Sequence, residues 1–155
     1  MALETEADAM SETQMRLFAS VLDALIPPSE DGSQPGAGEM GLAEILVKKV
    51  PELIPVLVQG LSALGEEMEN RQLADFAALA AEEKRSLLEC VAVREPGFLP
   101  GLVFQTYANY YQQPRVLEAL GLEARPPYPR GHELEVGDLN LLDPVRSRPR
   151  LYRRC

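Results

Sequence analysis

The sequence predicts an all-α fold, a compact bundle of about five to six helices followed by a long irregular C-terminal tail. Apolar residues recur in several segments at the three- and four-residue spacing of a buried helix face. No segment of convincing length alternates apolar and polar residues in the manner of a strand. Of the 155 residues, 46% are hydrophobic, which is enough for one domain to bury a core.

The first helix is expected to begin after Ser11, which forms a capping-box pattern with Gln14. Its apolar face comprises Phe18, Val21, Leu22 and Leu25. Pro27 and Pro28 end this helix, because proline removes a backbone donor and restricts the residue before it.

A polar loop follows at residues 29–38 and is rich in turn-forming residues, with Asp31 among them. Asp23 lies near the end of the first helix, beside its apolar face. We expect Asp23 to bond backbone groups of the loop, so that Asp23 and Asp31 have structural roles.

A third helix is expected from Pro51 onward, since proline suits the first helical turn. It is apolar on most sides, which predicts a central position in the bundle. Its apolar residues are Leu53, Ile54, Leu57, Val58, Leu61 and Leu64. Gly60 and Gly65 either allow close packing or weaken this helix.

Shorter elements surround this helix in the sequence. The apolar spacing predicts a second helix at residues 40–49 and a fourth at residues 81–93. Between the third and fourth helices, residues 73–79 are predicted to form a short turn of helix. A sixth helix is expected at residues 114–120, stopped by Gly121 in the usual position after a helix.

A fifth helix at residues 96–111 carries two apolar stripes. One stripe is Leu99, Leu102, Val103, Thr106 and Tyr110, and the other is Phe104, Tyr107, Ala108 and Tyr111. We expect the first to face the core and the second to be covered by the tail or by a partner. Tyrosine is enriched in interfaces, because it combines a large contact area with a polar tip.

The tail is predicted to span residues 122–155, after a helical body of residues 1–121. Compact domains rarely keep so long a segment with little secondary structure unless it is functional or disordered. Pro126 and Pro127 favour extended polyproline geometry. We expect them and Tyr128 to dock on the tyrosine-rich stripe of the same molecule, with a partner contacting the outside of this layer.

Charge is distributed unevenly along the chain. The net charge is −9, yet residues 143–155 contain five arginines, Arg146 and Arg148 among them, and one aspartate. This basic end can meet an acidic surface either on its own body or on another protein. The acidic remainder disfavours nonspecific binding to nucleic acid.

The expected compartment is the cytoplasm, because the first residues form no export signal. A periplasmic location would require a partner that carries a signal, or a signal trimmed from this chain. No apolar run is long enough for direct membrane insertion.

A single histidine, His132, excludes most enzyme classes. Di-iron bundles need paired Glu-x-x-His motifs, and zinc sites need clusters of cysteine and histidine. The chain also has no phosphate-binding loop and no dinucleotide-binding glycine motif. We therefore expect no catalytic, cofactor-binding or metal-binding residues. An enzyme or small-ligand binder that uses a pocket between helices is the least favoured alternative.

Several apolar and turn-forming motifs occur in a recognisable order. They are FASVLDALIP at residues 18–27, Asp31 with Pro35-Gly36-Ala37, FAALAAEEKRSLL at residues 76–88, Phe98, Thr106 with Tyr110-Tyr111, Leu120-Gly121 and PPYP at residues 126–129. In this order and spacing the chain resembles the gluconate 2-dehydrogenase subunit 3 family, and the likeness covers most of its length.

The resemblance implies a noncatalytic accessory subunit of a bacterial oxidoreductase complex. Its partner would be a large FAD-dependent subunit of the glucose-methanol-choline oxidoreductase type, a sugar or alcohol dehydrogenase that this chain stabilises or helps to mature. FAD is then expected in the partner, with no cofactor in this chain. Many family members carry an N-terminal twin-arginine signal, and the first residues of this sequence do not show one. The alternative is a stand-alone helical interaction module, such as a homodimer formed through the same tyrosine-rich stripe.

Overall fold

The computed structural model describes residues 10–126, 128–131 and 135–149. These residues form helices and no strand, which confirms the predicted all-α class. The chain divides into two units, one ending at Arg125 and the other beginning at Pro126. None of the described helices is both long enough and apolar enough to cross a membrane.

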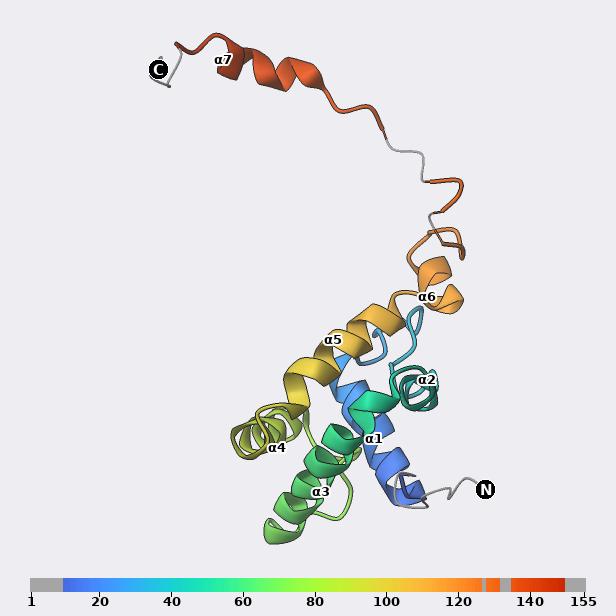
Figure 1. Cartoon of the computed structure of the whole chain (residues 1–155), viewed down its shortest axis with the longest axis vertical. Coiled ribbons are helices and arrows are strands. Elements are labelled where there is room, and N and C mark those ends of the chain that lie inside the picture. The colour runs from blue at the N-terminus through green and yellow to red at the C-terminus, as the bar shows by residue number, and fades with distance from the viewer. Residues whose placement is uncertain (1–9, 127, 132–134, 150–155) are drawn as a thin grey trace, which may run out of the picture. The chain divides into compact units, whose positions relative to one another are not determined.

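The first unit is a helical bundle (Figure 1). Its elements are α1 (Glu12–Leu25), α2 (Leu42–Lys49), the short 3-10 helix η1 (Pro51–Leu53), α3 (Ile54–Asn70), α4 (Ala81–Arg94), α5 (Phe98–Tyr110) and α6 (Pro114–Ala119). Among α1 to α5, α1 and α5 each contact all four of the others, and α3 packs against α1, α4 and α5. As predicted for the third helix, α3 packs inside the bundle, and Leu57, Leu61 and Leu64 are among its buried residues.

The start of α1 follows the capping-box prediction. The Ser11 hydroxyl accepts the backbone N–H of Gln14 at 3.2 Å, and the Gln14 side chain accepts the N–H of Ser11 at 3.0 Å. The two bonds satisfy amide donors that have no partner within the helix. Three residues of the predicted apolar face are fully buried, namely Phe18, Val21 and Leu22. The helix ends immediately before Ile26 and the proline pair.

Gly60 and Gly65 have different surroundings, although both lie in α3. A Cβ atom at Gly60 would lie 2.2 Å from Cδ2 of Phe98, so only glycine allows α3 and α5 to approach this closely. A Cβ atom at Gly65 would meet nothing within 4 Å. Close packing within the chain thus explains Gly60 but not Gly65.

The short helical turn predicted at residues 73–79 is wrong, because this connection is irregular. The Asp75 carboxylate accepts the N–H of Ala77 at 2.9 Å and so competes with a helical backbone bond. A single turn bond joins the N–H of Leu79 to the carbonyl of Phe76 at 3.3 Å. The apolar signal came from Phe76, which is buried, and from Leu73 and Leu79, which pack against the core while partly exposed.

The second unit contains more secondary structure than the sequence predicted. A short 3-10 helix, η2 (Leu139–Leu142), leads into α7 (Asp143–Arg146). The Asp138 side chain caps η2 by accepting the N–H of Asn140 at 3.0 Å. The prediction of an irregular tail relied on apolar periodicity and therefore missed this capping residue.

Candidate functional site

The two stripes of α5 have different environments. Leu102, Thr106 and Tyr110 are fully buried, as expected for the core stripe. The Thr106 hydroxyl donates to the carbonyl of Leu102 at 2.7 Å, which satisfies this buried polar group. Leu99 and Val103 are only half-buried. Phe98 and Asn109 are buried as well, although the sequence did not assign them to the core.

The opposite stripe presents three aromatic side chains at its surface, which we call the aromatic face: Phe104, Tyr107 and Tyr111. Their exposed fractions are 69%, 45% and 44%. The rings of Tyr107 and Tyr111 are stacked, with centroids 6.0 Å apart and planes at 25°. Ala108, assigned to the same stripe, is half-buried. The face is thus partly preorganised by contacts between its own rings.

Tyr110 joins the aromatic face to the α1–α2 loop. Its ring meets that of Tyr111 edge to face, with centroids 5.1 Å apart. Its buried hydroxyl donates to the carbonyl oxygen of Pro35 at 2.7 Å. Removal from water raises the pKa of this hydroxyl, because burial favours the neutral form that donates the bond. The sequence placed Tyr110 in the core but carried no signal for its bond to Pro35.

Asp23 holds the C-terminal half of the α1–α2 loop. One of its carboxylate oxygens accepts the N–H of Gly38 at 2.7 Å and that of Glu39 at 3.1 Å. A Cβ atom at Gly38 would lie 1.9 Å from the carbonyl oxygen of Ala19, and one at Gly36 would lie 2.3 Å from the Asp23 carboxylate. The two glycines therefore let the loop lie directly against α1.

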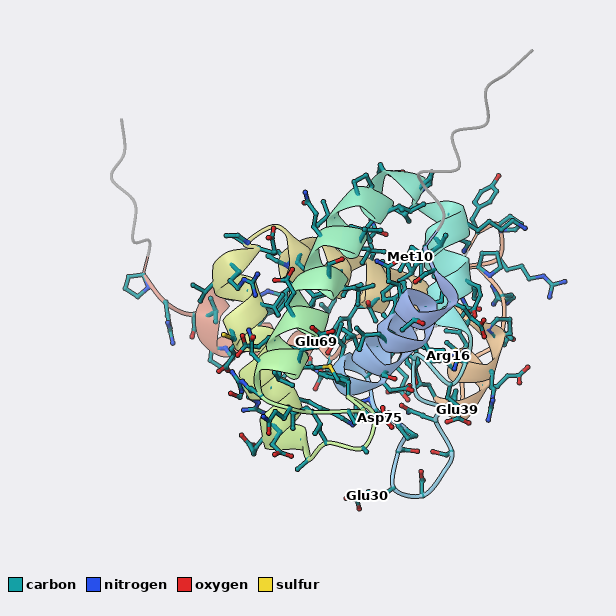
Figure 2. All side chains as sticks on the ribbon, turned by 90° about the horizontal axis from the view of Figure 1, so that it is seen from below. Met10, Arg16, Glu30, Glu39, Glu69 and Asp75 are labelled. Carbon is teal, nitrogen blue, oxygen red and sulfur yellow. The ribbon has the colours of Figure 1, made fainter. Side chains whose placement is uncertain are left out.

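Asp31 organises the outer part of the loop. Its carboxylate accepts the Ser29 hydroxyl at 2.6 Å, the Ser33 N–H at 3.0 Å and the Ser33 hydroxyl at 2.8 Å. These bonds, the one from Ser29 foremost, lower the pKa of Asp31 from 3.8 to about 2. Figure 2 shows this loop projecting from the helices, with Glu30 near its tip.

The other residues assigned to partner or tail binding lie in the second unit. Pro126 and Tyr128 are exposed there, and Arg146 pairs with Asp143 at 3.3 Å within α7. Arg148 is also exposed. Pro127 and His132 lie outside the described residues. Docking of this unit on the aromatic face stays a prediction.

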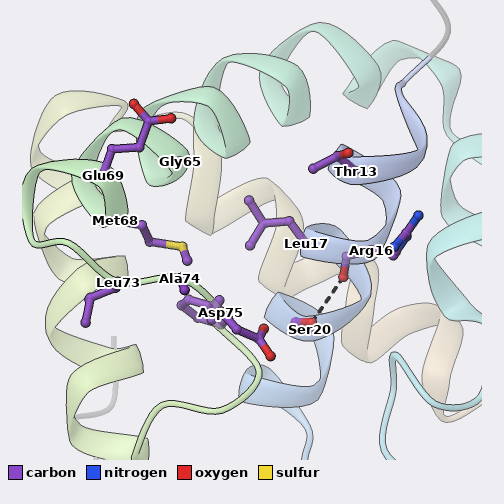
Figure 3. Close-up of a pocket in the computed structure, with 11 residues that line it drawn as sticks. Thr13, Arg16, Leu17, Ser20, Gly65, Met68, Glu69, Leu73, Ala74 and Asp75 are labelled. Atoms are coloured by element: carbon purple, nitrogen blue, oxygen red, sulfur yellow. Dashed lines mark hydrogen bonds between the residues drawn. The ribbon is translucent and has the colours of Figure 1, made fainter.

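Two grooves that the sequence did not predict open between helices of the first unit. The larger has a volume of about 430 Å³ and lies between α1, α3 and the connection from α3 to α4 (Figure 3). The smaller, of about 310 Å³, lies between α1, α4 and α5, and its wall includes Leu25, Leu88 and Leu99.

The part of the chain that the structure describes contains no group of three or more His, Cys, Asp or Glu side chains arranged to hold a metal ion. In that same part, every fully buried side-chain nitrogen or oxygen has a hydrogen-bond partner. We therefore take the aromatic face as the candidate functional site. Tyr110 connects this face to the α1–α2 loop.

Comparison with known proteins concerns the first unit. No curated protein sequence and no solved structure matches the chain significantly. The family model of gluconate 2-dehydrogenase subunit 3 matches residues 12–120. The match begins at the first residue of α1 and ends just after α6, so it contains the aromatic face and the Asp23 loop. The chain belongs to the gluconate 2-dehydrogenase subunit 3 family.

Proposed function

We propose that this chain is the noncatalytic accessory subunit of a flavin-dependent sugar or alcohol dehydrogenase and binds the large subunit through its aromatic face. Its family is that of a small subunit in a dehydrogenase complex, which supports an accessory role. The observation that carries the proposal is the exposure of Phe104, Tyr107 and Tyr111 along one side of α5. Exposed aromatic residues on a rigid helix are typical anchors of protein interfaces.

The size of the face suits an anchor within a larger interface. Aromatic side chains bury roughly 150–250 Å² each, so covering the exposed parts of three would remove on the order of 300 Å² from water. At about 25 cal/mol per Å² this gives roughly 7 kcal/mol before the entropic losses of association. Stable interfaces bury about 1,600 Å² in total, so further surfaces must contribute.

The proposal assigns FAD to the large subunit of the glucose-methanol-choline type. The role of this chain is then to stabilise that subunit or to help it mature, in whichever compartment the large subunit is found. Pro126, Tyr128, Arg146 and Arg148 are proposed to add contacts outside the aromatic face. A partner with an acidic patch would suit the two arginines.

A homodimer through the aromatic face is the second candidate, because the same exposed rings can pack against a second copy. Light scattering of the purified chain separates the two candidates. A monomer that binds the large subunit supports the proposal. A stable dimer that buries Phe104 and Tyr111 favours the alternative.

Co-expression with a candidate flavoprotein dehydrogenase from the same genome tests the proposed function. We expect the large subunit to copurify with the tagged chain, and to be less soluble or less active when the chain is omitted. The proposal would be contradicted by a large subunit that is soluble and fully active without this chain and does not copurify with it.

A further inference from the structure

The groove between α1 and α3 has an apolar floor and an open mouth. Leu17 of α1 and Met68 of α3 project toward each other across it, as Figure 3 shows. Phe76, from the connection between α3 and α4, is fully buried beneath the groove. The hydroxyls of Thr13 and Ser20 line the α1 side. At about 430 Å³, the space accommodates a large apolar side chain with its neighbouring backbone.

Gly65 supplies an independent observation about this groove. Glycine inside a helix lowers stability relative to alanine, so its presence is explained where something must approach the backbone closely. Phe98 is that neighbour for Gly60, five residues earlier in the same helix. For Gly65 no atom of the described chain lies within 4 Å of the Cβ position, and Gly65 lines the groove. An occupant other than the described residues would explain this glycine.

The charges at the groove indicate the chemistry of that occupant. Glu69 and Asp75 are exposed at its edge. Arg16, the one basic residue of the lining, is engaged by Glu12 at 2.7 Å. The rim therefore presents an excess of negative charge beside an apolar floor. A segment with a basic residue next to an apolar one complements both features.

We infer that this groove docks a segment of a partner polypeptide in which a large apolar side chain lies next to lysine or arginine. The apolar side chain fills the space above Gly65, between Leu17 and Met68. The neighbouring cation faces Glu69 and Asp75. The groove is built from α1, α3 and the α3–α4 connection, so it is a binding site separate from the aromatic face on α5.

The test is an NMR titration of the full-length ¹⁵N-labelled chain with three synthetic peptides at low salt. The probe contains leucine between two arginines, and the controls replace either the leucine by alanine or both arginines by aspartate. We expect saturable shifts of the Gly65, Ala74 and Asp75 amides with the probe. Affinity should be at least ~10-fold lower for each control, since one anchor or one charge pair typically changes affinity by about that factor.

Substitutions in the chain test the same geometry. Gly65→Leu should abolish saturable binding while keeping the fold, because its Cβ meets no neighbour. Glu69→Gln with Asp75→Asn should lower affinity roughly 3- to 10-fold at low salt and remove most of its salt dependence. Because the charge variants keep Gly65, they test the inference even when Gly65→Leu does not fold. No saturable shift at millimolar probe, equal binding of the acidic control, or unchanged binding by the variants would overturn the inference.

Discussion

The hydroxyl of Tyr110 donates a 2.7 Å hydrogen bond to the carbonyl oxygen of Pro35, 75 residues earlier in the chain. This bond ties the end of α5 to the loop that Asp23 holds against α1. The same ring meets Tyr111 edge to face at 5.1 Å. One buried side chain therefore connects the loop to the aromatic face.

Tyr110→Phe should destabilise the fold by about 1–3 kcal/mol, because it leaves the buried carbonyl of Pro35 without this donor. Urea unfolding at pH 7 measures the free energy. Tyr111→Phe is the matched control, since this neighbouring ring is 44% exposed, and it should change stability by less than ~0.5 kcal/mol. Equal losses in the two variants would show that the Tyr110 bond has no special weight.

Asp23→Ala should lower the free energy of unfolding by about 1–3 kcal/mol, because the N–H groups of Gly38 and Glu39 lose their acceptor. Asp23→Asn keeps a carbonyl oxygen in the same place and should recover part of this loss. Chemical denaturation of the three proteins provides the comparison. If alanine and asparagine behave alike, acceptance of these two bonds is not what Asp23 contributes.

The two glycines of α3 form a matched pair of tests. Gly60→Ala should destabilise the protein by about 1–3 kcal/mol, because the new methyl group would overlap the ring of Phe98. Gly65→Ala should stabilise it by about 0.4–1 kcal/mol, since alanine favours a helix and the position is open. Thermal unfolding by circular dichroism measures both. Changes of the same sign would contradict the packing described for α3 and α5.

The helices of the first unit could be predicted from the sequence because local signals define them. The capping box at Ser11 and the proline pair after Ile26 mark both ends of α1. Apolar spacing along α5 also separated the buried side at Leu102 from the exposed side at Phe104. Such signals lie within a few residues of the structure that they specify.

Relationships between distant residues could not be predicted in this way. The Tyr110–Pro35 bond and the close approach of Gly38 to Ala19 depend on how helices pack, which no local pattern encodes. The groove at Gly65 is likewise formed by two helices and a connection. In the connection from α3 to α4, the apolar spacing wrongly predicted a helical turn. There the N–H of Ala77 bonds to the Asp75 side chain, which competes with a helical backbone bond.

The acid dependence of stability should contain a contribution from Asp31. Its pKa is about 2 in the folded protein, against 3.8 for an unperturbed aspartate, so folding favours the ionised form. This contribution is fully present above pH 3.8 and is lost as the pH falls through 2.

Urea unfolding of the wild type and Asp31→Asn between pH 2 and 5 isolates this contribution. We expect the wild type to lose more stability than the variant over this range, because only the wild type must protonate the carboxylate. Glu30→Gln, at the neighbouring exposed position, is the control. A difference between wild type and Asp31→Asn that does not vary with pH would contradict the assignment.

The affinity of the proposed partner, a purified large dehydrogenase subunit, for variants of this chain tests the role of the aromatic face most directly. Phe104→Ala with Tyr111→Ala should weaken binding by ~30-fold or more, as truncation of interface anchors usually does, with little loss of folding stability. Val93→Ala, which truncates an 82% exposed side chain on α4, should bind as the wild type does. Equal affinity of all three proteins, or unfolding of the double variant, would contradict the assignment of the aromatic face as the binding surface.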